Sequence, residues 1–355
     1  MPGDINKQDN INNADAQWLL EHLAQNPNYS GTEQGYTLEE FKEQCTVVNP
    51  SGNVFSCADA SYIYSHVKEQ VNSTNNYPIT QPEPEPEPEP GTGGYQFADK
   101  AALQTAVNLW ISNKSTALST YGEINTWDTS LVTDMKDLFR DKTTFNDNIS
   151  NWDVSNVTTM DMMFSDARAF NQPIGSWDVS NVNTMYRMFM DAYSFNSSIG
   201  NWDTSNVTSM KSMFRTARGF NQDISTKPNV TMNGKTYTAW NVSKVTNMHG
   251  MLHNNSVDPY AFNQPIGNWD VSKVTNMGYM FTRAQVFNQP LGDWVVSNVT
   301  NMHALFTEAA AFNQEIRNWD VSNVNYFGSM FFWATKMNAS PWNAPDTPDA
   351  SWFNQ

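Results

Sequence analysis

The sequence predicts an α/β solenoid of 25-residue repeats, each with one parallel strand and one short helix, preceded by a small all-α domain. Three observations carry this prediction. Eight of the 13 tryptophans lie on one grid with a 25-residue period. The residues around these tryptophans are nearly identical from one repeat to the next. A run of alternating proline and glutamate separates the repetitive region from the first 80 residues.

The composition excludes several classes of protein. The chain has 355 residues, with 20 basic and 36 acidic side chains and a formal net charge of −16. Nucleic acid is an unsuitable partner, because phosphate binding needs lysine and arginine. No apolar run approaches the ~20 residues of a membrane span. No secretory signal is visible at the N-terminus, so the route of export stays open.

The proline–glutamate run at 81–90 marks a linker that ends in glycines. Proline restricts φ and the glutamates repel one another, so we expect an extended polyproline-II spacer with a flexible glycine hinge. This linker divides the chain into a helical domain at 1–80, a linker at 81–94, a capped solenoid at 95–339 and a C-terminal tail or cap at 340–355.

The tryptophan grid is interrupted in one place. Trp240 lies 38 residues after Trp202 and 29 before Trp269, which indicates insertions of 13 and 4 residues. The tryptophans on the grid are Trp127, Trp152, Trp177, Trp202, Trp240, Trp269, Trp294 and Trp319. We expect this column to form the core rather than a sugar-binding platform.

Within one unit, apolar spacing predicts both elements. One face of a short helix is indicated by residues at i, i+3, i+4 and i+7, namely Met185, Met188, Phe189 and Ala192. Trp177 and Val179 alternate with polar neighbours, as a strand facing a core would. A unit this short cannot bury its own apolar face, so the units are expected to stack with strands ~4.8 Å apart.

The repeat Val-Thr-x-Met-x-x-Met-Phe-x-x-Ala-x-x-Phe-Asn-Gln-x-Ile-x-x-Trp-Asp-Val-Ser, present from about 97 to 338, resembles that of BspA-like leucine-rich-repeat surface proteins, specifically the 25-residue type of mycoplasma lipoproteins. The resemblance implies a surface-exposed, non-catalytic protein engaged in adhesion or partner binding. It does not name the ligand.

Both ends of such a stack need caps. An amphipathic pattern at 97–120 predicts an N-terminal cap helix. The tail at 340–355 either covers the last edge or leaves a half-made repeat that pairs with a neighbouring molecule, because an uncovered edge is a template for head-to-tail assembly.

The two insertions mark a candidate partner-binding region. Asn233-Gly234 within 226–239 predicts a β-hairpin with a type I′ turn, and Tyr237 follows it. His249 and His253 stand at i, i+4 in the next unit, just before the 4-residue insertion. Insertions in repeat proteins often lie on the binding face, although neutral variation in loops is the alternative. Paired histidines can also bind metal, but no carboxylate or cysteine stands at ligand spacing, so a solvated helix face is favoured.

A column of aspartates follows the tryptophans, from Asp128 to Asp320. We expect each carboxylate to accept backbone N–H groups in a turn. A ladder of metal ligands is the alternative, and Val295 interrupts it.

The first domain carries a candidate calcium loop. Oxygen-bearing residues at loop positions 1, 3, 5, 7 and 12 are Asp4, Asn6, Gln8, Asn10 and Asp15. With the amphipathic helix that follows, this region resembles a dockerin, the module with two calcium loop–helix units that binds cohesin partners. Gln8 replaces the usual aspartate and Asp9 the usual glycine, so one bound Ca²⁺ and a metal-free helical module both stay open.

The only cysteines, Cys45 and Cys57, flank the second, uncharged loop. In an oxidising environment they could form a disulfide, and two free thiols are the alternative.

The sequence thus favours a non-enzymatic extracellular or cell-surface protein whose solenoid binds a protein or cell-surface ligand. The alternative is a structural subunit of a filament or virion surface that binds its own copies head to tail. No catalytic constellation stands out from the repeat background, so we expect no enzymatic activity.

Overall fold

The computed structural model describes residues 47–48, 54–55, 94–341 and 343–353. The chain divides into two units, Met1–Glu87 and Pro88–Gln355. Most of the linker lies outside the described residues. So do the candidate calcium ligands and cysteines, which are Asp4, Asn6, Gln8, Asn10, Asp15, Cys45 and Cys57.

The described part of the first unit is a pair of short strands. β1 (Val47–Val48) pairs antiparallel with β2 (Val54–Phe55). This differs from the all-α domain predicted for 1–80. β-branched and aromatic residues favour strands, and the Pro-Ser-Gly sequence between them favours a turn.

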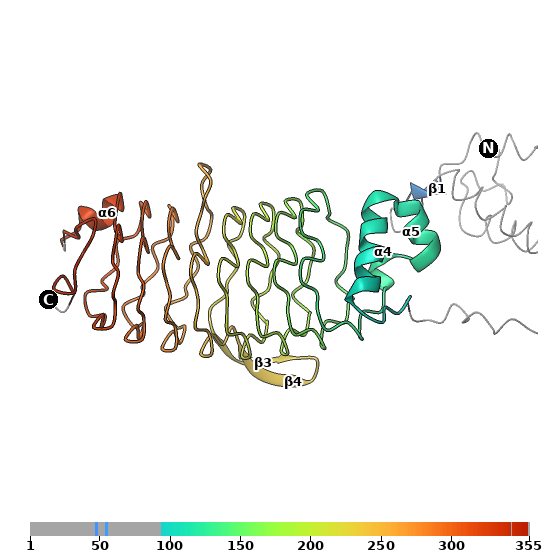
Figure 1. Ribbon diagram of the computed structural model, residues 1–355, viewed down its shortest axis with the longest axis horizontal. Coiled ribbons are helices and arrows are strands. Elements are labelled where there is room, and N and C mark those ends of the chain that lie inside the picture. Colours follow the sequence, from blue (N-terminus) through green and yellow to red (C-terminus); the bar gives the residue numbers. More distant parts are fainter. Residues whose placement is uncertain (1–46, 49–53, 56–93, 342, 354–355) are drawn as a thin grey trace, which may run out of the picture. The chain divides into compact units, whose positions relative to one another are not determined.

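The second unit is a row of coils lying side by side (Figure 1). Each coil contains one grid tryptophan, and the residue seven positions after it forms a parallel bridge with its equivalent in the next coil. These bridges join Asp134, Thr159, Thr184, Ser209, Asn247, Asn276, Asn301 and Tyr326 in that order. The insertions do not interrupt the ladder, because the bridge from Ser209 runs to Asn247 across the longer of them.

The short helix predicted at 185–192 is wrong. This stretch forms turns, in which Arg187 and Asp191 have left-handed φ angles of 54° and 58°. The backbone N–H groups alternate in direction. That of Arg187 donates to the Lys211 carbonyl in the next coil (3.0 Å), whereas that of Met188 closes a turn onto Met185 (3.2 Å). A helix would direct every N–H group along its own axis, and the bonds between coils would be lost.

The tryptophans form the core, and all eight on the grid are buried. The indole Nε1 of Trp202 donates to the carbonyl of Ile174 in the preceding coil (3.1 Å). Neighbouring indoles stack, as Trp269 and Trp294 do at 6.3 Å between centroids. Stacking satisfies the indole N–H and buries the ring at the same time, so each coil needs its neighbour.

Helices cover the first coil. α4 (Lys100–Ser112) begins at Asp99, whose side chain accepts from the Ala102 N–H, and α5 (Lys114–Tyr121) follows directly. A short 3₁₀ turn, η1 (Ile124–Thr126), then leads into the stack. Trp110 of α4 is buried edge-on against Trp127 at 5.7 Å. α4 therefore takes the place that a preceding coil would occupy.

The C-terminal tail covers the last coil. After α6 (Thr335–Asn338), the Asp346 carbonyl accepts from the Phe331 N–H (2.9 Å), and the Thr347 hydroxyl accepts from the Ser329 N–H (2.9 Å). Phe353 is buried beside Phe327. These are the donors that would otherwise face a further coil.

No helix in the described residues is long and apolar enough to cross a membrane.

Candidate partner-binding surface

Each coil contains two stretches that differ in how much their exposed residues vary. In the coil of Trp177 we call residues 184–194 the variable segment and 195–208 the constant segment, and we use the same names for their equivalents in other coils. All eight coils have serine three positions after the tryptophan. Seven have asparagine nineteen positions after it, and in the coil of Trp240 the 4-residue insertion moves this asparagine to Asn263, 23 positions after the tryptophan. Nine positions after the tryptophan stand Lys136, Asp161, Tyr186, Lys211, His249, Gly278, His303 and Gly328.

The polar side chains of the constant segments bond to the stack itself. Asp178 accepts from the Ser180 N–H (3.1 Å), which confirms the predicted turn. The Asn196 Oδ1 accepts from the N–H of Asn221 in the next coil (2.9 Å). The Asn206 amide, part of a glycosylation sequon, donates to the Ser180 carbonyl (2.8 Å). These groups already have partners within the fold, so they serve its stability.

The variable segments carry a row of rings that continues from coil to coil. His249 meets Tyr279 edge-on at 5.3 Å, Tyr279 meets His303 at 4.8 Å, and His303 stacks on Tyr326 at 4.7 Å. His253 also packs on Tyr279, at 6.0 Å. The structure therefore brings the predicted residues His249 and His253 together. They lie half-buried on a turn, which corrects the prediction of a solvated helix face.

The surroundings of both histidines favour the neutral imidazole. Burial, with the charges of Arg215, Arg283 and His249, lowers the pKa of His253 to about 4. Burial and the Lys211 ammonium lower the pKa of His249, and a hydrogen bond to Asn276 opposes this shift. Both side chains are thus uncharged rings near pH 7. Within the described residues no group of three His, Cys, Asp or Glu side chains could hold a metal ion.

Beside these rings lie three cations that form no ion pair in the described residues: Arg187, Lys211 and Arg215. They occupy adjoining coils, since the Arg187 N–H donates to the Lys211 carbonyl. Arg187 and Lys211 also flank the ring of Tyr186, at 4.9 and 5.8 Å from its centroid. We call these three cations the cationic cluster.

The inserted hairpin confirms the predicted turn but lies against a different part of the coils. β3 (Lys227–Met232) and β4 (Lys235–Ala239) pair antiparallel, and Asn233 and Gly234 have φ angles of 51° and 74°. In Figure 1 the two strands run along one edge of the stack. The Tyr237 hydroxyl donates to the Asn201 carbonyl (2.6 Å).

Lys235 of the hairpin forms an ion pair with Asp178 at 2.8 Å. Burial alone would raise the pKa of Asp178, but its hydrogen bonds with Lys235 and Ser180 hold the pKa below its usual range. The hairpin thus packs on constant segments, whereas the histidines belong to the variable ones. The predicted binding residues therefore form two groups.

The 4-residue insertion forms a loop that begins next to the histidines. Tyr260 is buried and its hydroxyl donates to the Phe214 carbonyl (3.1 Å), and Arg218 forms an ion pair with Asp258. At the loop tip the Val257 side chain is 92% exposed. The loop is anchored at its base and presents an apolar tip.

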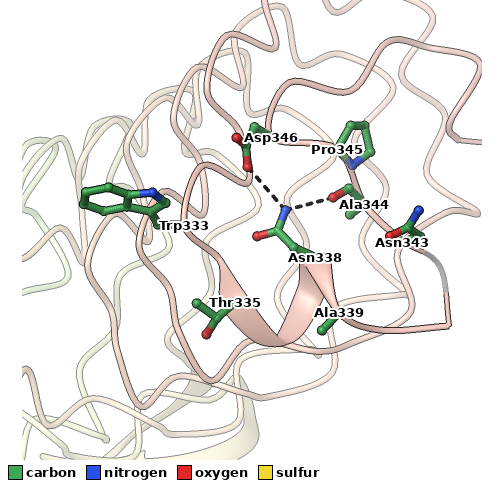
Figure 2. Close-up of a pocket in the computed structure, with 8 residues that line it drawn as sticks. All are labelled: Trp333, Thr335, Asn338, Ala339, Asn343, Ala344, Pro345 and Asp346. Carbon is green, nitrogen blue, oxygen red and sulfur yellow. Dashed lines mark hydrogen bonds between the residues drawn. The ribbon is translucent and has the colours of Figure 1, made fainter.

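An open pocket of about 610 Å³ lies at the last coil. Figure 2 shows Asn338 of α6 at its centre, hydrogen-bonded to the Ala344 carbonyl (2.8 Å) and to Asp346 (3.5 Å). Trp333 lies at one end and is 63% exposed. The bonds in this pocket hold the capping tail to α6, so we assign it to the cap.

The cationic cluster and Tyr279 were missed by the sequence analysis, which looked for residues that interrupt the period. A signal was present in the alignment of the units. Positions nine, ten, thirteen and fourteen after each tryptophan change freely in charge and size, whereas the neighbouring Met and Phe positions do not.

The comparisons with known proteins give one match. The family described as "Mycoplasma protein of unknown function, DUF285" matches twice, over residues 107–227 and 226–343. Neither the curated proteins nor the solved structures yield a match. The matched residues cover most of the stacked coils and well over half of the chain. The protein therefore belongs to this Mycoplasma DUF285 family of repeat-containing proteins.

Proposed function

We propose that the protein is a non-enzymatic surface protein whose stacked coils form a solenoid and bind a partner through their variable segments. One observation carries the proposal: serine and asparagine recur at two at least partly exposed positions in all eight coils, whereas the side chain nine positions after the tryptophan ranges over lysine, aspartate, tyrosine, histidine and glycine. Positions that bond to neighbouring coils keep one residue type. Positions released from that requirement supply the diversity that specific binding needs.

Finer features of the proposal rest on resemblance. BspA-like leucine-rich-repeat proteins provide the analogy for adhesion at a cell surface. The dockerin-like region at 1–80, with one Ca²⁺, would attach the protein to a larger assembly through the linker. Family membership supports the repeat region, and the attachment module is proposed from its sequence alone.

The alternative, a filament built head to tail, receives less support. It requires a coil edge that is free to pair with the next molecule. In the described residues α4 covers the first coil, and residues 346 and 347 accept hydrogen bonds from the last. A binding surface along the side of the stack fits this arrangement better than one at its ends.

The test is a solid-phase binding assay of the full chain on immobilised extracellular-matrix proteins and glycans. A variant with Tyr186→Ala, His249→Ala and Tyr279→Ala removes three rings of the variable segments. A matched control with Ser155→Ala, Asn181→Ala and Ser322→Ala changes one half-buried and two exposed side chains of the constant segments.

We expect the first variant to lose binding and the control to keep it. Equal binding by both variants, or growth in light scattering with concentration in place of binding, would overturn the proposal. Thermal unfolding of each variant checks that it is folded.

A further inference from the structure

We propose that the cationic cluster and the row of rings beside it form a binding site for an acidic polysaccharide, one that carries sulfate or carboxylate groups along a chain of pyranose rings. This inference rests on the proposed function, because it names the class of ligand for the variable segments. Three features of the molecule point to such a ligand: the unpaired arginines, the order of the rings and the charge of the rest of the chain.

The arginines of the cluster are unusual in this protein. The chain has seven arginines, and five of them form ion pairs with aspartate or glutamate: Arg140, Arg168, Arg218, Arg283 and Arg317. The other two, Arg187 and Arg215, form no ion pair within the described residues, although the charge of Arg215 partly offsets the rise that burial causes in the pKa of Asp191. They lie in adjoining coils with Lys211 beside them. In a chain of net charge −16, cations left without acidic partners mark a place where an external anion would bind.

Two side chains near this surface are incompletely hydrogen-bonded within the described residues. The Nε atom of Arg187 is buried and has no hydrogen-bond partner, and the same is true of Nδ1 of His303 further along the row. Buried atoms do not themselves reach an external ligand. The remaining N–H groups of the Arg187 guanidinium, which form no ion pair within the described residues, are the ones available to an anion.

The rings make the site linear. Tyr186 has Arg187 and Lys211 near its ring. Lys211 occupies the equivalent position in the next coil, and rings resume with His249 and Tyr279 in the two coils after that. The two histidines have lowered pKa values and therefore add uncharged ring surface rather than further cations. Tyrosine rings pack on the apolar faces of sugars, while arginine forks bind sulfate and carboxylate oxygens.

Other linear anions fit less well. An acidic peptide would use the cations but offers a ring face only where an aromatic or proline residue stands at the right spacing, whereas every unit of a polysaccharide presents one. A nucleic acid carries a charge on every phosphate, and three cations neutralise too few phosphates for tight binding at physiological salt. A polysaccharide with separated charges matches three cations followed by neutral rings.

The experiment measures binding of the full chain to four immobilised polymers: heparin, polygalacturonate, poly-L-glutamate and neutral dextran. The test variant is Arg187→Gln with Arg215→Gln. The control is Arg140→Gln with Arg317→Gln, which makes the same change in net charge at arginines that have acidic partners. A third variant, Tyr279→Ala, removes a ring without changing charge.

We expect the wild type to bind heparin or polygalacturonate and neither of the other two polymers. The test pair should weaken that binding by about tenfold, and the control by less than about twofold. Tyr279→Ala should weaken it by roughly threefold or more. The thermal midpoints of the variants, compared with the wild type, show whether each is folded.

Three results would overturn the inference. If poly-L-glutamate binds as tightly as the glycans with the same dependence on Arg187 and Arg215, the site recognises acidic protein segments. If no polymer binds while a matrix protein binds through the variable segments, the proposed function stands and the polysaccharide site is wrong. If nothing binds through the variable segments, both proposals fail.

Discussion

The constant and variable segments of each coil share one backbone but differ in what their side chains bond to. In the constant segments, Asn196 and Asp178 have their hydrogen-bond partners in neighbouring residues or coils. In the variable segments, Arg187 keeps a buried nitrogen without a partner and Trp333 is largely exposed. The variable segments hold the stack through backbone hydrogen bonds and buried Met and Phe side chains, and the constant segments add side-chain hydrogen bonds. The exposed side chains of the variable segments are therefore left open to variation.

The largest expected effect comes from removing the core that both segments share. Trp202→Ala deletes a fully buried indole and its hydrogen bond to the Ile174 carbonyl. We expect a loss of about 3–5 kcal/mol in the free energy of unfolding, because a cavity remains where the indole packed. Urea denaturation followed by the fluorescence of the remaining tryptophans measures this loss.

The matched control for that variant is Tyr186→Ala in a variable segment. Its half-buried ring contacts two cations, and we expect a cost below about 1 kcal/mol. Equal costs at the two sites would contradict the distinction between core and variable residues.

The next effect is a pH dependence carried by the variable segments. His253 has its pKa lowered to about 4 in the folded protein, by burial and the charges of Arg215, Arg283 and His249. Between that value and the ordinary 6.5, the unfolded chain binds the proton more tightly than the folded one. The stability associated with the neutral His253 side chain is therefore fully present above about pH 6.5 and is lost as the pH falls towards 4.

From pH 7 to pH 5 we expect His253 to account for a loss of about 2 kcal/mol. The carboxylates titrate as well, so the informative quantity is the difference between wild type and His253→Gln. The variant should lose less stability than the wild type over this range in urea denaturation. Parallel curves would mean that the imidazole is as easily protonated in the folded chain as in the unfolded one.

A smaller loss of stability is expected from a substitution in the constant segments. The Asn196 side chain accepts hydrogen bonds from the backbone N–H of Asn221 (2.9 Å) and from the side-chain amide of Gln222 (3.0 Å), both in the next coil. Asn196→Ala should cost about 1 kcal/mol, because water replaces the lost acceptor at this exposed position. Gln285→Ala in a variable segment is the control and should stay within about 0.5 kcal/mol of wild type by the same assay. A larger loss for the control would reverse the assignment of the two segments.

Several features were predictable from the sequence because they depend on local spacing. The tryptophan period predicted which rings are buried, and Asn233-Gly234 predicted the turn between β3 and β4. The short helix was wrong, because residues at i, i+3, i+4 and i+7 face inward in a series of turns as well as in a helix. Between the first two of these inward-facing positions, each coil has a residue with a left-handed φ angle, such as Asp137 or Gly250. A left-handed residue there is incompatible with a continuous right-handed helix.

The candidate site was predictable only in part. His249 and His253 attracted notice because they stand beside an insertion. Their contacts with Tyr279 depend on the register between coils, which brings position nine of one unit against position ten of the next. The unpaired state of Arg187 and Arg215 is likewise a property of the packed chain, since it depends on where each carboxylate lies.

The smallest effect tests whether the hairpin belongs with the constant segments. Lys235 at the turn pairs with Asp178, and the hydrogen bond raises the pKa of Lys235 while lowering that of Asp178. Exposed pairs of this kind contribute little to stability. Lys235→Ala should therefore leave the urea midpoint unchanged, while the pKa of the Asp178 carboxyl, followed by NMR, rises. If the pKa of Asp178 stayed where it is, the hairpin would not rest on this coil in solution. It would then be free to present Asn233 and Gly234 to a partner. The hairpin would in that case extend the binding surface and would not pack on the constant segments.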